Sequence, residues 1–148
     1  MTDAPFGALR PGETTVEPPE SPDAQLWFLG RIRTPWATPR DCPRRGDPES
    51  GPECRIELAP RWAPLLDGVA ERERLLVLYW MHLARRDLAT QRRRGERPLR
   101  GTFALRSPMR PNPIAASEVA LLRIEDATLV VRGLDCVDAT PLVDLKPA

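Results

Sequence analysis

The chain has 148 residues, of which 41% are hydrophobic and 29% are charged, and its formal net charge is +1. This length suits one domain, and no stretch approaches the roughly 20 consecutive apolar residues that a membrane-spanning helix needs. The near-neutral charge gives the molecule no strong overall field that attracts nucleic acid. The first residues lack the apolar segment of a secretory signal, so we expect a soluble protein, without a membrane partner, in the cytoplasm.

Residues 1–24 are rich in proline and acidic residues and have no apolar periodicity. This composition predicts a flexible Pro-rich N-terminal arm, because such a segment has too little apolar surface to bury. Order is expected to begin at residue 25, and residues 25–148 are predicted to form a single domain.

Short runs rich in β-forming residues predict strands over 25–32, 54–59, 74–82, 101–105, 117–125 and 128–134. A turn of helix is expected over 60–68, and the tight turn between the last two strands predicts a hairpin. Residues 35–52 form a long loop of the kind that tends to carry function. With 18 prolines and little helix, the chain is predicted to be an all-β barrel or sandwich with short helical or irregular insertions.

Residues 85–100 are the one strongly basic segment, with seven arginines against two acids. Two interpretations stay open, a surface that contacts nucleic-acid phosphates and a solvated loop. Phosphate contact would make binding weaken as the salt concentration rises.

The residues of metal and nucleotide sites are sparse. The three cysteines, Cys42, Cys54 and Cys136, are odd in number and widely spaced, so we predict free thiols and no metal site. The single histidine, His82, follows an apolar run and is expected to be structural. Neither of the common glycine-rich phosphate loops occurs, so a bound cofactor would need another architecture.

Two segments carry a resemblance. Residues 103–114 read FALRSPMRPNPI and residues 134–147 read LDCVDATPLVDLKP. They resemble the F-A-T-R-S…R-P-N-P-I-G and L-D-x-x-D-G-T-P-x-x-D-I-K-P-Y blocks of the TsaA-like family. Residues 29–35 and 43–45 match further family positions in the same order, so the resemblance spans about residues 29–147.

The best-known members of that family methylate N6-threonylcarbamoyladenosine beside the tRNA anticodon. The resemblance implies a TsaA-like β-barrel of the eight-stranded type, S-adenosylmethionine as the methyl donor, tRNA as a partner, and a homodimer with the cofactor near its interface. An S-adenosylmethionine-dependent tRNA methyltransferase is therefore the leading interpretation. The alternatives are a non-catalytic S-adenosylmethionine-binding sensor or interaction module, and a methyltransferase with a different substrate.

Family positions also carry over to single residues. The cofactor contacts implied by the resemblance fall on Pro43, Arg44, Arg45, Arg74, Leu75, Arg106, Ala116, Asp138, Ala139, Thr140 and Pro141. Contacts with tRNA are expected from Arg92, Arg93, Arg94, Arg110 and Asn112.

Methylation of a carbamoyl-bearing nitrogen requires loss of its proton, and Asp138 is the first candidate for the base, with Asp135 and Asp144 as others. The alternative is that these acids cap turns or pair with basic residues. Among the tryptophans, Trp36 is the better candidate for stacking on bases, whereas Trp80 is expected in the core.

The chain departs from the family pattern at four positions. Ala115 and Ala139 stand where the family has glycine, Arg74 stands at the histidine, and Ala148 follows the final proline in place of tyrosine. A position that needs a positive φ would make the alanine Cβ costly. These departures make the methylated substrate less certain than the cofactor.

Overall fold

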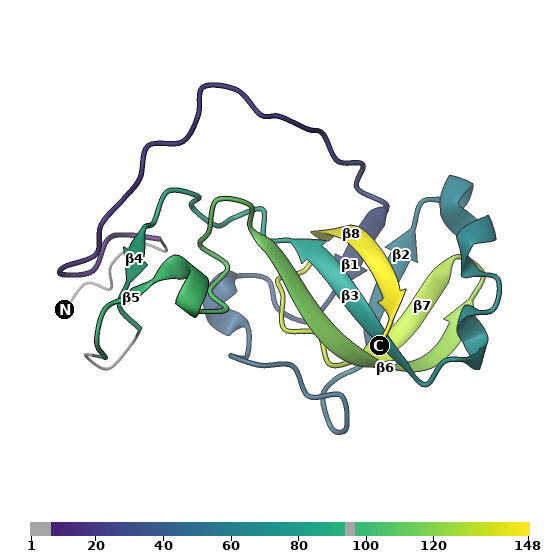
Figure 1. The fold of residues 1–148 in the computed structure, drawn as a ribbon. Coiled ribbons are helices and arrows are strands. Elements are labelled where there is room, and N and C mark those ends of the chain that lie inside the picture. The colour runs from purple at the N-terminus through teal and green to yellow at the C-terminus, as the bar shows by residue number, and fades with distance from the viewer. Residues whose placement is uncertain (1–6, 94–96) are drawn as a thin grey trace. The chain divides into compact units, whose positions relative to one another are not determined.

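A computed structural model describes residues 7–93 and 97–148 (Figure 1). The chain forms two compact units, one made of Met1–Gln25 with His82–Pro113 and the other of Leu26–Met81 with Ile114–Ala148. Each unit is described by itself below. Within the described ranges, no helix is both long and apolar enough to cross a membrane.

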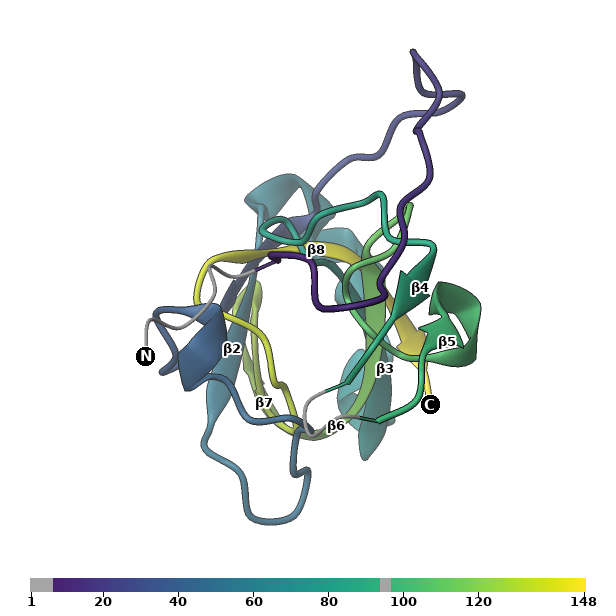
Figure 2. The ribbon, with the colours of Figure 1, turned by 90° about the vertical axis from the view of Figure 1, so that its left-hand side faces the viewer.

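The second unit is a closed antiparallel barrel with strand order β1-β2-β7-β6-β3-β8 (Figures 1 and 2). Its strands are β1 (Gly30–Arg33), β2 (Cys54–Leu58), β3 (Arg74–Trp80), β6 (Ile114–Glu125), β7 (Thr128–Arg132) and β8 (Thr140–Pro147). The long β6 closes the barrel because its first half pairs with β3 and its second half with β7. The all-β barrel prediction is confirmed, but the expectation of eight barrel strands is wrong. Six strands close the barrel, and β4 and β5 pair in the other unit.

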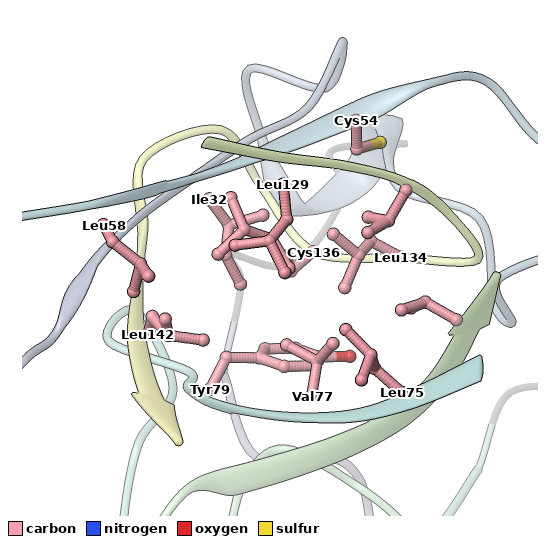
Figure 3. Close-up of a cluster of buried hydrophobic side chains, with 13 residues drawn as sticks. Ile32, Cys54, Leu58, Leu75, Val77, Tyr79, Leu129, Leu134, Cys136 and Leu142 are labelled. Carbon is pink, nitrogen blue, oxygen red and sulfur yellow. The ribbon is translucent and has the colours of Figure 1, made fainter. Parts of the chain in front are cut away.

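The barrel interior follows from the alternation of side chains along each strand. In β3, Leu75, Val77 and Tyr79 point inward and are at most 2% exposed, while the residues between them face outward. Figure 3 shows these side chains meeting Ile32 and Leu129 from the opposite wall. Burial of each large apolar side chain contributes about 1.5–3 kcal/mol, so this cluster is the main source of the barrel's stability.

The predicted β6–β7 hairpin is confirmed, with Asp126 at φ 55° in its two-residue turn. The expected turn of helix is a 3₁₀ helix, η2 (Pro60–Leu66), followed by η3 (Val69–Glu71). Gly68 lies between them at φ 81°, a conformation that glycine adopts without steric cost.

Two strand predictions differ from the structure at the ends of the barrel. The first strand begins only at Gly30, where a Cβ would lie 2.0 Å from the carbonyl oxygen of Glu57, so that only glycine allows this approach of β1 to β2. Strand β8 was not among the predicted strands, and it contains two prolines, Pro141 and Pro147. It nevertheless pairs with both β1 and β3.

In the first unit, β4 (Thr90–Gln91) and β5 (Arg100–Gly101) form a short pair, followed by η4 (Thr102–Ala104). The strand predicted over 101–105 is wrong, because Thr102 holds the chain in a turn. Its hydroxyl donates to the Leu88 carbonyl at 2.7 Å and accepts from Gln91 Nε2 at 2.8 Å.

Part of the N-terminal segment belongs to this first unit. Thr15 bridges to Leu88, and the Val16 N–H donates to the Asp87 carbonyl at 2.7 Å. The Glu13 carboxylate accepts from the N–H groups of Arg10 and Arg92, each at 2.7 Å. The flexibility of residues 1–24 and the single-domain boundary at residue 25 stay predictions.

Candidate functional site

Two connections leave the same end of the barrel, the β1–β2 loop (34–53) and the β7–β8 segment (133–139). They do so because β1 is the antiparallel neighbour of both β2 and β8, and β2 is that of β7. Strands β7 and β8 are not neighbours, so the 133–139 segment crosses the barrel end. Its Leu134 and Cys136 side chains fill the interior there (Figure 3).

The two connections touch backbone to backbone at Gly46 and Gly133. A Cβ on Gly46 would lie 1.7 Å from the Gly133 carbonyl oxygen, so only glycine fits this contact. Gly133 itself has φ 120°, a region that other residues avoid. The loop is thereby fixed against the segment.

Hydrogen bonds within the loop also hold its shape. Asp47 Oδ1 accepts from the N–H groups of Glu49 at 2.9 Å and Ser50 at 3.0 Å. At η1 (Pro39–Asp41), Asp41 Oδ2 accepts from the N–H of Thr38 at 3.1 Å and from its hydroxyl at 2.8 Å. The long loop that the sequence marked as a candidate is thus an ordered structure.

Pro43, Arg44 and Arg45 are exposed in this loop, just before the Gly46 contact. Among the described residues, no carboxylate lies within ion-pair distance of either guanidinium. The preceding residue, Cys42, is half-buried, and burial together with the nearby Asp135 carboxylate raises its pKa to about 11. The Gly46–Gly133 contact therefore holds the guanidinium groups of Arg44 and Arg45 close to the 133–139 segment, which carries Asp135 and Asp138.

Asp138 caps the turn that leads into β8. Its Oδ1 accepts from the Thr34 N–H at 3.1 Å, its own N–H donates to the Trp36 carbonyl at 2.7 Å, and its Oδ2 lies 3.7 Å from Arg33 Nη1. This is the turn-capping alternative that the sequence left open. Asp138 is nevertheless partly exposed and can accept a further hydrogen bond.

The two alanines at family glycine positions differ in backbone conformation. Ala139 has φ 69°, in the left-handed region where a Cβ is unfavourable. Ala115 lies in strand β6 opposite Tyr79, without a positive φ. The steric cost expected from the sequence is therefore present at Ala139 only.

Several predicted cofactor contacts have side chains that are already engaged. Thr140 is 1% exposed and donates its hydroxyl to the Val137 carbonyl at 2.7 Å, and Pro141 is buried beside it. Leu75 points into the barrel. Arg74 forms an ion pair with Glu49, and Ala116 lies half-buried opposite Leu78. Thr140, Pro141 and Leu75 offer a ligand their backbone atoms at most.

A network of hydrogen bonds that the sequence analysis did not predict extends into the barrel interior. The Tyr79 hydroxyl donates to Asp135 Oδ1 at 2.6 Å and lies 2.7 Å from Ser117 Oγ. Because the phenol has one hydrogen, Ser117 is the donor in the second bond. Burial, followed by the Asp135 charge, raises the pKa of Tyr79 above its ordinary value. A tyrosine inside an apolar run was the available signal, since a buried hydroxyl needs a partner.

The other predicted contacts lie in the first unit. Arg106 is exposed. The Arg110 guanidinium donates to the carbonyls of Leu105 at 2.9 Å and Ser107 at 3.0 Å, and Asn112 Oδ1 accepts from Arg86 at 3.3 Å.

The predicted tRNA contacts of the basic segment also differ from one another. Arg92 donates to the carbonyls of Pro11 at 3.1 Å and Arg97 at 2.9 Å, whereas Arg93 is exposed. Arg94 lies outside the described residues. Across the described ranges, no group of three or more histidine, cysteine or acidic side chains is arranged to hold a metal.

The fold and site define a class of protein, a small closed β-barrel whose end carries a cationic loop fixed against an acidic segment. A family model described as the tRNA-methyltransferase O N-terminal domain matches residues 31–148. The chain belongs to this family, and the resemblance stated from the sequence is confirmed.

Two relatives of similar sequence have names that describe cofactor binding. The probable S-adenosyl-L-methionine-binding protein VirR of Rhizobium radiobacter is 47% identical over 139 residues, which are 94% of this chain and 79% of that protein. A probable S-adenosyl-L-methionine-binding protein of Methanothermobacter thermautotrophicus is 40% identical over 80% of this chain and 85% of its own length.

Solved structures of TrmO show the same fold. One matches 84% of this chain with a TM-score of 0.68 and 29% identity, and TrmO from Pseudomonas aeruginosa matches 84% with a TM-score of 0.66 and 27% identity. This chain spans 57% and 55% of the length of those two chains.

Proposed function

We propose that this protein is an S-adenosylmethionine-dependent methyltransferase that methylates N6 of threonylcarbamoyladenosine in tRNA. The carrying observation is the Gly46–Gly133 contact, which fixes the Arg44–Arg45 loop against the acidic 133–139 segment. Membership of the tRNA-methyltransferase O family and the names of the relatives support the cofactor and the reaction class.

The residues present fit S-adenosylmethionine, which carries a carboxylate, an ammonium group, ribose hydroxyls and an adenine ring. Arg44 and Arg45 provide charge for the carboxylate, since guanidinium groups suit planar anions. Asp135 and Asp138 provide acceptors for the ammonium group or the ribose. Pro43, Arg74, Leu75, Arg106, Ala116, Ala139, Thr140 and Pro141 remain further proposed contacts.

The bound cofactor supplies a methyl group already activated on a sulfonium, so the chain itself needs no nucleophile. Its residues hold the reacting groups in line, a contribution that can reach about 7–11 kcal/mol. A carboxylate then accepts the proton of the acceptor nitrogen. Asp138 remains the proposed base, and Asp135 is its competitor because its position is fixed by the Tyr79 hydroxyl.

The proposal also covers the tRNA contacts, the oligomeric state and the cellular compartment. Arg92, Arg93, Arg94, Arg110 and Asn112 are proposed to contact tRNA, the protein is proposed to act as a homodimer, and the cytoplasm is the proposed compartment. Arg93 is the strongest of these proposed tRNA contacts, because its side chain is exposed and, within the described ranges, no carboxylate lies within ion-pair distance of it.

Calorimetry with S-adenosylmethionine tests cofactor binding. Replacing both Arg44 and Arg45 with alanine should weaken affinity by at least tenfold, as expected for loss of charge-assisted hydrogen bonds. Arg72→Ala is the matched control, since Arg72 follows η3, is also exposed and has no carboxylate within ion-pair distance among the described residues. Wild-type protein that gives no heat at millimolar cofactor contradicts the proposal.

Methyl transfer is tested with labelled cofactor and tRNA that carries threonylcarbamoyladenosine, followed by digestion to nucleosides. Asp138→Asn keeps an acceptor for the Thr34 N–H but removes the base, and Asp135→Asn makes the same change at the competitor. The true base is the one whose variant loses turnover while still binding cofactor. Binding without transfer in the wild type favours the second candidate, a cofactor-binding module, which the relatives' names alone also describe.

A further inference from the structure

We propose that an aromatic face on the outside of the second unit stacks on unpaired bases of single-stranded RNA. The aromatic face consists of Trp27, Phe28, Trp62, Arg31 and Arg61. The proposal relies on the proposed function only for the choice of RNA as the nucleic acid, and its test needs no cofactor and no methyl transfer.

Two of the three rings of this face are exposed to solvent, and Trp62 is half-buried. Trp27 is 78% exposed and Phe28 is 44% exposed. The Trp27 and Trp62 ring centroids lie 6.1 Å apart with an interplanar angle of 31°. The Phe28 ring centroid also lies 6.2 Å from that of Trp80, and clustered exposed rings mark an interaction site more often than single exposed residues do.

Backbone hydrogen bonds hold the two segments that carry the tryptophans. Leu29, two residues after Trp27, donates its N–H to the Leu142 carbonyl and accepts from the Ala59 N–H, each at 2.9 Å. The Trp62 N–H donates in turn to the Ala59 carbonyl at 3.0 Å. The backbone that carries the rings is thus held in place, which lowers the entropic cost of ordering it when a base stacks.

Two cations border the rings. The Arg31 guanidinium lies 5.8 Å from the Phe28 ring centroid. Among the described residues, neither Arg31 nor Arg61 has a carboxylate within ion-pair distance, whereas Arg33 on the same side of β1 bonds Glu57 at 2.7 Å. Flat apolar rings beside unpaired cations match a chain of bases linked by phosphates.

A second copy of this chain is a poorer occupant. A carboxylate nearby, Glu57 opposite Arg31 on β2, is already bonded to Arg33 at 2.7 Å, so a second copy would find few acidic groups at Arg31 and Arg61. Trp36, the stacking candidate from the sequence, packs against the barrel core instead.

The test uses the full chain and a fluorescein-labelled 12-nucleotide single-stranded RNA, with anisotropy measured in the absence of cofactor. Trp27→Ala should weaken binding about 5- to 100-fold, while Trp27→Phe should recover most of the affinity because it keeps a ring. Arg31→Ala should weaken binding and flatten its salt dependence. Leu65→Ala is the matched control, since it removes exposed apolar surface without a ring, and it should change affinity less than threefold.

Three outcomes overturn the inference. The first is wild-type protein that does not bind the RNA, and the second is an unchanged affinity in Trp27→Ala. The third is a loss of self-association in Trp27→Ala, seen by sedimentation, with RNA affinity intact, which assigns the face to a second copy. RNA binding that depends on Trp27 in a protein without methyl transfer supports the inference while contradicting the proposed function.

Discussion

Tyr79 donates its hydroxyl hydrogen to the Asp135 carboxylate across 2.6 Å, joining the interior of the barrel to the segment that crosses its end. Ser117 completes the chain by donating to the Tyr79 oxygen. A buried hydroxyl bound to an acidic group fixes the position of that group, so this contact couples barrel stability to the geometry of the candidate site.

Tyr79→Phe should lower the free energy of unfolding by about 1–3 kcal/mol, because Asp135 loses a hydrogen bond and Ser117 loses its acceptor. Urea denaturation measures this change. Ser117→Ala should cost less, and the double variant should cost less than the sum of the two single changes. If the free-energy changes of the single variants add up exactly in the double variant, the three groups do not form one coupled hydrogen-bond network.

Ala139→Gly should raise the free energy of unfolding by about 0.5–1 kcal/mol, since Ala139 has φ 69° and glycine relieves the strain. Ala115→Gly is the matched control in strand β6, where the same change should destabilise the protein. Urea denaturation of the two variants gives shifts of opposite sign if the assignment is correct. A loss of stability in Ala139→Gly contradicts it.

Gly46→Ala should release the Arg44–Arg45 loop, because the added Cβ has no room against the Gly133 carbonyl. The expected result is faster amide hydrogen exchange over residues 43–51 and at least tenfold weaker S-adenosylmethionine binding. Gly101→Ala is the control, since nothing lies within 4 Å of a Cβ built there. Unchanged exchange in Gly46→Ala argues against the loop contact.

Alkaline pH should destabilise the protein through its buried thiols. Burial raises the pKa of Cys54 to about 11 and that of Cys136 to about 12, from an ordinary value of 9.0. The unfolded chain then releases these protons at lower pH than the folded protein does. Their contribution to stability is complete below pH 9 and disappears as the pH rises through 11–12.

Urea denaturation between about pH 8 and pH 10.5 measures this loss, which reaches at most about 1.4 kcal/mol per thiol per pH unit. Tyr79 adds to it in the same direction above its ordinary pKa. Cys136→Ala should show a shallower decline than the wild type. Identical slopes in the two proteins would assign the decline to other groups.

Arg93→Ala should weaken tRNA binding and reduce the slope of log affinity against log salt by about one, if Arg93 neutralises one phosphate. Arg92→Ala is the comparison, because its guanidinium bonds backbone carbonyls of the first unit and its loss should lower stability. Filter binding across a salt series separates the two effects. An unchanged slope in Arg93→Ala removes this residue from the proposed interface.

Local sequence was sufficient for much of the barrel. Strands β2, β3, β6 and β7 were predicted within a few residues, because short runs of β-forming residues between turn residues are a local signal. Strand β8 and the turn at Thr102 were not, since proline content and a buried threonine hydroxyl have consequences only once neighbouring strands and carbonyls are in place.

The sequence by itself determined the family and named Pro43, Arg44, Arg45 and Asp138 as candidates, because those residues lie in short contiguous motifs. Only the tertiary structure decided which of them share a location. Gly46 contacts Gly133, and Tyr79 bonds Asp135, although the members of each pair lie far apart in the chain. The exposure of Trp27 likewise depends on what the rest of the fold leaves uncovered. Such contacts depend on how the barrel closes, and no local pattern encodes that closure.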